Sequence, residues 1–238
     1  MTNRLITRRQ LLFGVCCLSM GMASCISDET SIPGLIDAEP HPRDADEALA
    51  RLKQGNQRFL NDKPRHTHEK ASWRSLLVEN QKPFATVVGC SDSRVPPEFI
   101  FDVGFGDLFT VRLAGNIIAE DVIGSLQYAV AHLHTPLVLV LGHEGCGAVA
   151  ATVEEMLDKA RELEHIESLI KSIKPGLKNL NLKMGRDILL RAAVEANVRW
   201  SMRQLLALPE AERALREKRV TLLGAVYELS TGRVRFLD

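Results

Sequence analysis

The stretch VVGCSDSRVPPEF, residues 87–99, decides how the chain folds. An apolar run ends at Cys90, and Asp92 and Arg94 follow almost at once. A packed core has no need of these groups at the end of a buried strand, because burying them without partners costs free energy. The pattern therefore indicates a strand whose carboxyl end carries a binding or catalytic site.

Short apolar runs alternate with helical patterns along the chain. The expected strands are residues 84–89, 107–115, 135–143, 220–229 and 233–237. The expected helices are residues 45–60, 125–134 and 147–207, the last broken near Pro175 and Gly176. This alternation predicts an α/β fold with a mostly parallel sheet and an antiparallel edge strand.

A second strand also ends in reactive residues. The segment GHEGCGAV, residues 142–149, places His143 and Cys146 directly after the apolar run of residues 135–142. Ligands of open parallel sheets bind at the carboxyl ends of the strands, so Cys90 would meet these two residues if the strands are neighbours. Two thiolates and one imidazole are a ligand set of catalytic zinc, which keeps a fourth position open.

Two other interpretations of the cysteines stay open at this stage. Cys90 and Cys146 are the two cysteines of the globular part, and such a pair in an exported protein is compatible with one disulfide. A closed structural zinc site is the other alternative. Neither accounts for Asp92 and Arg94. His66 and His68 are interpreted as residues of an exposed polar loop rather than as metal ligands.

Length and composition suit one α/β domain, placed at residues 44–238. The chain has 238 residues, of which 45% are hydrophobic, and 30 basic residues balance 30 acidic residues. Nucleic-acid-binding proteins carry a basic face, so this balance predicts no nucleic-acid partner. Only 5% of the residues are aromatic.

The N-terminal segment has the features of an export signal. Residues 1–25 combine the pair Arg8 and Arg9 with an apolar run over residues 11–23, which is shorter than the ~20 residues that span a bilayer. The segment resembles a twin-arginine signal, which predicts an exported protein of the periplasm or an equivalent compartment. Lipidation of Cys25 would add a membrane tether, and an uncleaved hydrophobic anchor is the alternative. Residues 26–43 are expected to be a polar linker.

Several motifs resemble the β-class carbonic anhydrases. CSDSRVPPE and GHEGCGAV match the two zinc motifs of that family, and the resemblance extends over about residues 45–238. It includes the segments EALARLKQGNQRF, GDLFTVRLAGNI, GSLQYAV, EANVRWSMRQLL and GAVYELSTGRVRFL. The resemblance implies a four-stranded parallel sheet with an antiparallel fifth edge strand. It also implies a homodimer or larger homo-oligomer in which the N-terminal helix wraps the partner.

The resemblance implies an activity and a role for individual residues. The activity is the reversible hydration of CO₂ to bicarbonate and a proton by a hydroxide bound to Zn²⁺. The implied zinc ligands are Cys90, His143 and Cys146, and Asp92 and Arg94 form an orienting pair. Asp92 becomes a fourth ligand only in a closed form of the site. The implied substrate-binding residues are Gln81, Phe109 and Tyr128.

The motifs leave three questions open. A hydrolase of CS₂ or COS on the same fold, and a non-catalytic zinc protein of the envelope, are the alternative functions. Both the open and the closed form of the site are compatible with the sequence. His132 and His134 are either proton relays or ordinary histidines of a surface or core.

Overall fold

Five strands form one sheet in the order β2-β1-β3-β4-β5. The strands are β1 (Ala85–Gly89), β2 (Leu108–Arg112), β3 (Leu137–His143), β4 (Thr221–Tyr227) and β5 (Val234–Leu237). The first four strands of this order run parallel to one another, and β5 pairs antiparallel with β4. The predicted four-stranded parallel sheet with an antiparallel edge strand is therefore confirmed.

The computed structural model describes residues 40–158 and 162–237. The predicted export signal, the lipidation site Cys25 and most of the predicted linker lie outside these residues and stay predictions. Among the helices of the described part, none is long and apolar enough to cross a membrane.

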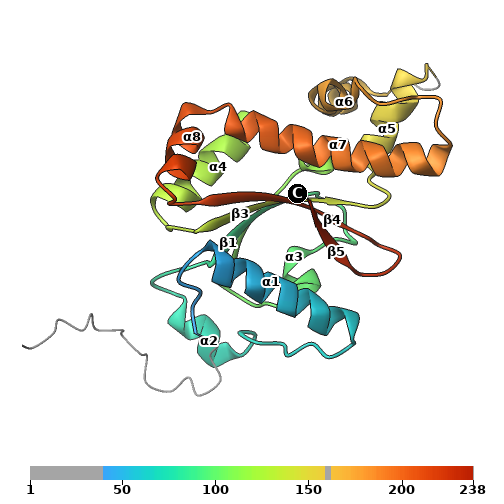
Figure 1. The fold of residues 1–238 in the computed structure, drawn as a ribbon. Coiled ribbons are helices and arrows are strands. Elements are labelled where there is room, and N and C mark those ends of the chain that lie inside the picture. Colours follow the sequence, from blue (N-terminus) through green and yellow to red (C-terminus); the bar gives the residue numbers. More distant parts are fainter. Residues whose placement is uncertain (1–39, 159–161, 238) are drawn as a thin grey trace, which may run out of the picture. The chain divides into compact units, whose positions relative to one another are not determined.

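Helices cover both faces of the sheet (Figure 1). The helices are α1 (Ala45–Leu60), α2 (Ala71–Leu76), α3 (Pro97–Ile100), α4 (Glu120–Ala131), α5 (Gly147–Met156), α6 (Glu164–Leu177), α7 (Arg186–Leu206) and α8 (Pro209–Arg216). The long helix α7 lies across β3 and β4 on one face, and α1 lies on the opposite face (Figure 1). Every residue of β1 and β3 is buried as a result, which explains their largely apolar sequences.

Helix α1 packs against its own chain. The Asp44 side chain caps the helix by accepting a hydrogen bond from the Glu47 backbone N–H at 2.9 Å. Further along, a Cβ on Gly55 would lie 1.7 Å from the carbonyl oxygen of Phe101, so the close approach of α1 requires glycine. Asn56 holds the β4–β5 hairpin, because its amide group donates to Gly232 O at 2.9 Å.

The segment 147–207, expected to be helical with one break near Pro175 and Gly176, forms three helices, α5, α6 and α7, and the second break begins two residues after Gly176. Both residues lie inside the last turn of α6, and the chain leaves helix between α6 and α7, at residues 178–185. Proline lacks only one backbone donor, and the burial of Ile173 and Leu177 stabilises this turn. Gly176 brings α6 against α7, since a Cβ there would lie 2.5 Å from Cβ of Trp200.

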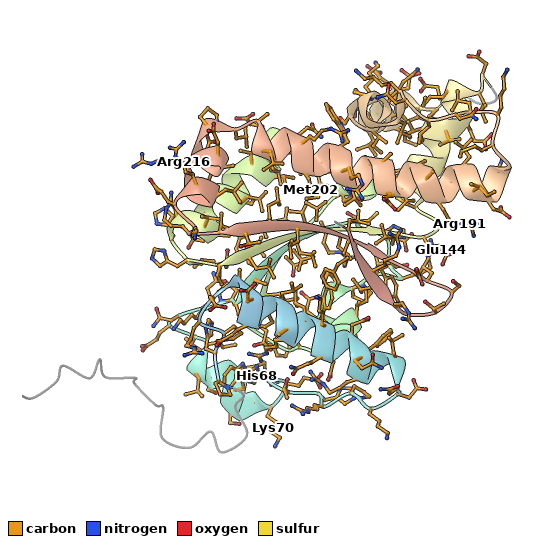
Figure 2. All side chains as sticks on the ribbon, viewed as in Figure 1. His68, Lys70, Glu144, Arg191, Met202 and Arg216 are labelled. Carbon is orange, nitrogen blue, oxygen red and sulfur yellow. The ribbon has the colours of Figure 1, made fainter. Side chains whose placement is uncertain are left out.

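The assignment of His68 to an exposed loop is wrong. Its side chain is 7% exposed, and Nδ1 lies 2.8 Å from a carboxylate oxygen of Asp107. The ring stacks on Trp73 with centroids 3.7 Å apart. Figure 2 shows His68 beside α2. Asp107 is buried and requires hydrogen-bond donors, which explains why the polar loop folds inward.

Candidate metal centre

Three side chains meet at the carboxyl ends of β1 and β3. The potential ligand atoms of Cys90, His143 and Cys146 all lie within 4.8 Å of one another, and all three residues are buried. The pairing of β1 and β3 explains this, because Gly89 is in register with Leu141. Cys90 therefore follows β1 at the level where β3 delivers His143, and Cys146 starts α5 one turn later.

The orientation of His143 leaves one ring nitrogen directed at the cluster. Nδ1 lies 2.9 Å from the carbonyl oxygen of Glu144, which can only accept, so Nδ1 carries the proton. Nε2 then has a free lone pair. This atom is buried and has no hydrogen-bond partner among the described residues. A buried nitrogen with a free lone pair beside two sulfurs fits a metal ion, which takes neutral imidazole and thiolate as ligands.

The two cysteines are free thiols rather than a disulfide. Hydrogen bonding from Cys146 lowers the pKa of Cys90, and the same contact together with burial raises the pKa of Cys146. The opposite directions of the two shifts reflect the repulsion between two thiolates held close together in a buried position. A divalent cation supplies the charge that two buried thiolates need.

Asp92 and Arg94 form an ion pair at the edge of the cluster. The carboxylate of Asp92 accepts from Nε of Arg94 at 2.9 Å and from Nη2 at 2.7 Å. These hydrogen bonds hold the pKa of the Asp92 carboxyl well below its usual range. Asp92 Oδ2 lies 3.9 Å from Nε2 of His143. The sequence is compatible with both an open and a closed form of the site. The structure has the open form, in which Asp92 is bound to Arg94.

Arg94 and Arg112 brace the loop that carries Cys90. Nη2 of Arg94 also donates to Gly145 O at 3.2 Å, which joins the two cysteine-containing segments. Arg112, at the end of β2, donates to Cys90 O at 2.8 Å and to Asp92 O at 2.7 Å. Arg112 lies in the recognised segment GDLFTVRLAGNI, but its role depends on a contact across two strands that the sequence does not display.

The second segment is fixed by a turn far along the chain. The carboxylate of Glu144 accepts from the backbone N–H of Ser230 at 3.0 Å and from its hydroxyl at 2.9 Å. These two hydrogen bonds lower the pKa of the Glu144 carboxyl, and the charge of Arg191, also labelled in Figure 2, lowers it further. The loop that bears His143 is therefore attached to the β4–β5 hairpin.

The three predicted substrate-binding residues do not join the cluster within one chain. Phe109 and Tyr128 lie together, with ring centroids 6.2 Å apart, and line a surface groove with Leu208. Phe109 is in register with Thr86, which lies three residues before the end of β1. This spacing places Phe109 roughly 10 Å, measured along the strand direction, from the end of β1 that leads into the cluster. Gln81 is exposed in the segment that leads into β1.

The two histidines considered as proton relays also lie away from the cluster. His132 and His134 are exposed and come just before β3, whereas His143 ends that strand. A strand of seven residues separates the two ends by about 20 Å, which is too far for direct proton transfer within the chain. Within one chain the structure therefore places neither histidine at the cluster.

Comparison with known proteins gives a consistent result. The sequence model of the family described as carbonic anhydrase matches residues 85–234. Carbonic anhydrase 2 of Mycobacterium tuberculosis is 35% identical over 191 residues, covering 79% of this chain and 90% of that protein. A carbonic anhydrase of Mycolicibacterium smegmatis is 36% identical over 187 residues, covering 77% and 88%.

Two solved structures with the same fold are β-carbonic anhydrases. The β-carbonic anhydrase CcaA superposes with a TM-score of 0.65 at 26% identity, covering 80% of this chain and 87% of that one. The Coccomyxa β-carbonic anhydrase in complex with acetazolamide has a TM-score of 0.64 at 25% identity, covering 79% and 86%. The buried Cys-His-Cys cluster, the sheet and these likenesses show that the chain belongs to the β-class carbonic anhydrase family.

Proposed function

We propose that the protein catalyses the reversible hydration of CO₂ to bicarbonate and a proton, with Zn²⁺ held by Cys90, His143 and Cys146. The observation that carries the proposal is the buried cluster, whose three donor atoms lie within 4.8 Å of one another beside the Asp92–Arg94 pair. Three protein ligands leave a fourth position for the reacting water, as catalytic zinc requires.

Zinc, when bound, lowers the pKa of a water molecule and so supplies a nucleophile near neutral pH. The two thiolates offset the double charge of the ion, so we expect this effect to be weaker than at a site of neutral ligands. The chain contributes the orientation of the ligands. Glu144 O fixes the tautomer of His143, and Arg112 fixes the carbonyl group of Cys90.

Asp92 is placed to orient the reacting water. Its carboxylate lies beside Nε2 of His143 and stays ionised, so it accepts a hydrogen bond but cannot donate one. Arg94 keeps the carboxylate in place with its planar guanidinium group. Because the Asp92 side chain is 18% exposed, solvent reaches this side of the otherwise buried cluster.

The position of Phe109 and Tyr128 supports a homodimer. If these rings line the CO₂ pocket, as the family resemblance implies, they must do so at the cluster of a second copy, because they lie far from the cluster of their own chain. We therefore expect a mass of at least two chains by light scattering at assay concentrations. A monomer that is fully active would contradict this arrangement.

The test of the function is CO₂ hydration followed by the drop in pH. We expect rapid hydration that a zinc chelator abolishes and added zinc restores. A protein that releases sulfide from COS but does not hydrate CO₂ would be a CS₂/COS hydrolase on this fold. A protein that binds zinc and does neither would be a non-catalytic zinc protein.

A further inference from the structure

One sulfur of the cluster accepts a hydrogen bond from the backbone. The N–H of Gly115 donates to Sγ of Cys90 over 3.3 Å, in a buried position. Gly115 lies in the 3₁₀ turn η1 (Ala114–Asn116), which follows β2. A hydrogen bond to a metal-binding sulfur withdraws electron density from it, and such contacts tune the metal.

The turn that presents this N–H is left-handed and tightly enclosed. Gly115 has φ of +70° and Asn116 has φ of +44°, both in the left-handed region. A Cβ on Gly115 would lie 2.7 Å from Cδ1 of Ile173 and 3.1 Å from Cβ of Ala148. Asparagine tolerates this conformation better than most other non-glycine residues, and hydrogen bonds from neighbouring elements fix the turn in one arrangement.

Helix α7 holds this turn in place through hydrogen bonds from two buried polar side chains. Nδ2 of Asn197 donates to Gly115 O at 2.8 Å. One turn later, the hydroxyl of Ser201 donates to Asn116 O at 2.9 Å and accepts from Nδ2 of Asn116 at 3.3 Å. Asn197 is 1% exposed and Ser201 is fully buried. A buried polar pair inside an apolar helix–sheet interface costs free energy unless it has partners, and here both partners belong to this turn.

We infer that Asn197 is a positioning residue that acts on the metal through Gly115. By fixing the Gly115 carbonyl group, it keeps the Gly115 N–H directed at Cys90 and so limits the charge that this thiolate donates. Ser201 supports the same turn from the next helical turn. The inference rests on the proposed function, because it requires a metal ion at the cluster.

The experiment compares Asn197→Leu with Asn56→Leu in protein in which cobalt replaces zinc. Leucine has a similar size but no donor. Asn56 is a buried asparagine of α1 that donates to the backbone carbonyl groups of Ile100 and Gly232. We expect Asn197→Leu to move the thiolate-to-cobalt absorption band to lower energy, because Cys90 becomes a stronger donor. We also expect kcat/KM to fall about tenfold, as for other losses of support around a metal ligand.

Asn56→Leu is expected to lower stability by a similar amount and to leave the band in place. Ser201→Ala, a smaller change, should move the band in the same direction by less, and it serves as the test if Asn197→Leu does not fold. If neither Asn197→Leu nor Ser201→Ala moves the absorption band away from its wild-type position, the inference is overturned and the proposed metal site still stands. A wild-type cobalt protein without any thiolate band would overturn the proposed metal site and the inference with it.

Discussion

A variant in which alanine replaces His143 is expected to lose zinc and to hydrate CO₂ no faster than the uncatalysed reaction. His143 supplies the nitrogen ligand, and its Nε2 has no hydrogen-bond partner among the described residues. Two thiolates alone do not complete the three-ligand set of catalytic zinc. Elemental analysis and stopped-flow hydration measure the two effects separately.

His165→Ala is the matched control for this variant. His165 is an exposed histidine in α6, so its loss should change neither the zinc content nor the rate. A His143→Ala protein that keeps one zinc per chain and full activity would place the metal at another set of residues.

Replacing Arg94 with alanine is expected to leave zinc bound and to lower kcat/KM on the order of 10²-fold, as for loss of a preorganised group. Arg94 donates to both carboxylate oxygens of Asp92. Without these bonds the carboxylate, which lies 3.9 Å from Nε2 of His143, can turn toward the metal position and block the open side of the cluster. Zinc content, measured beside the rate, separates this effect from loss of the metal.

The pH dependence of this variant shows the origin of the loss. Arg94 lowers the pKa of Asp92, so removing Arg94 raises that pKa toward the usual ~3.9. Asp92 is then ionised at neutral pH in both proteins, and protonation of Asp92 cannot explain a loss measured there. The loss should therefore persist at pH 7 and above.

Arg213→Ala provides the control for the Arg94 variant. Arg213 forms a similar exposed pair with Glu217 at 2.9 Å, in α8, and its loss should leave hydration unchanged. Turnover at the wild-type rate in Arg94→Ala would remove the Asp92–Arg94 pair from the mechanism.

The features that could be predicted from the sequence are those with a local signature. The buried strands β1 and β3 are largely apolar runs, and each is followed directly by residues that a core does not need. The two motifs could therefore be placed at neighbouring strand ends, and Cys90, His143 and Cys146 do meet there.

The features that sequence reasoning missed depend on contacts between distant segments. Nothing near His68 shows that Asp107 will bind it, and nothing near Pro175 shows that α6 will continue through that residue. Asn197 lies 107 positions after Cys90 in the sequence and affects it only through Gly115. Such residues become visible when the three-dimensional contacts are known.

The parallel pairing of β1 with β3 also constrains when a metal ion can be captured. Cys90 and His143 are separated in the chain by a crossover that contains β2 and α4, so β1 and β3 pair across a long loop. Closing so long a loop has an entropic cost that local contacts do not offset. A growing chain that has reached only β2 holds one of the three donors. The three donor atoms therefore come together only when β1 and β3 pair, so the candidate metal centre forms together with the sheet.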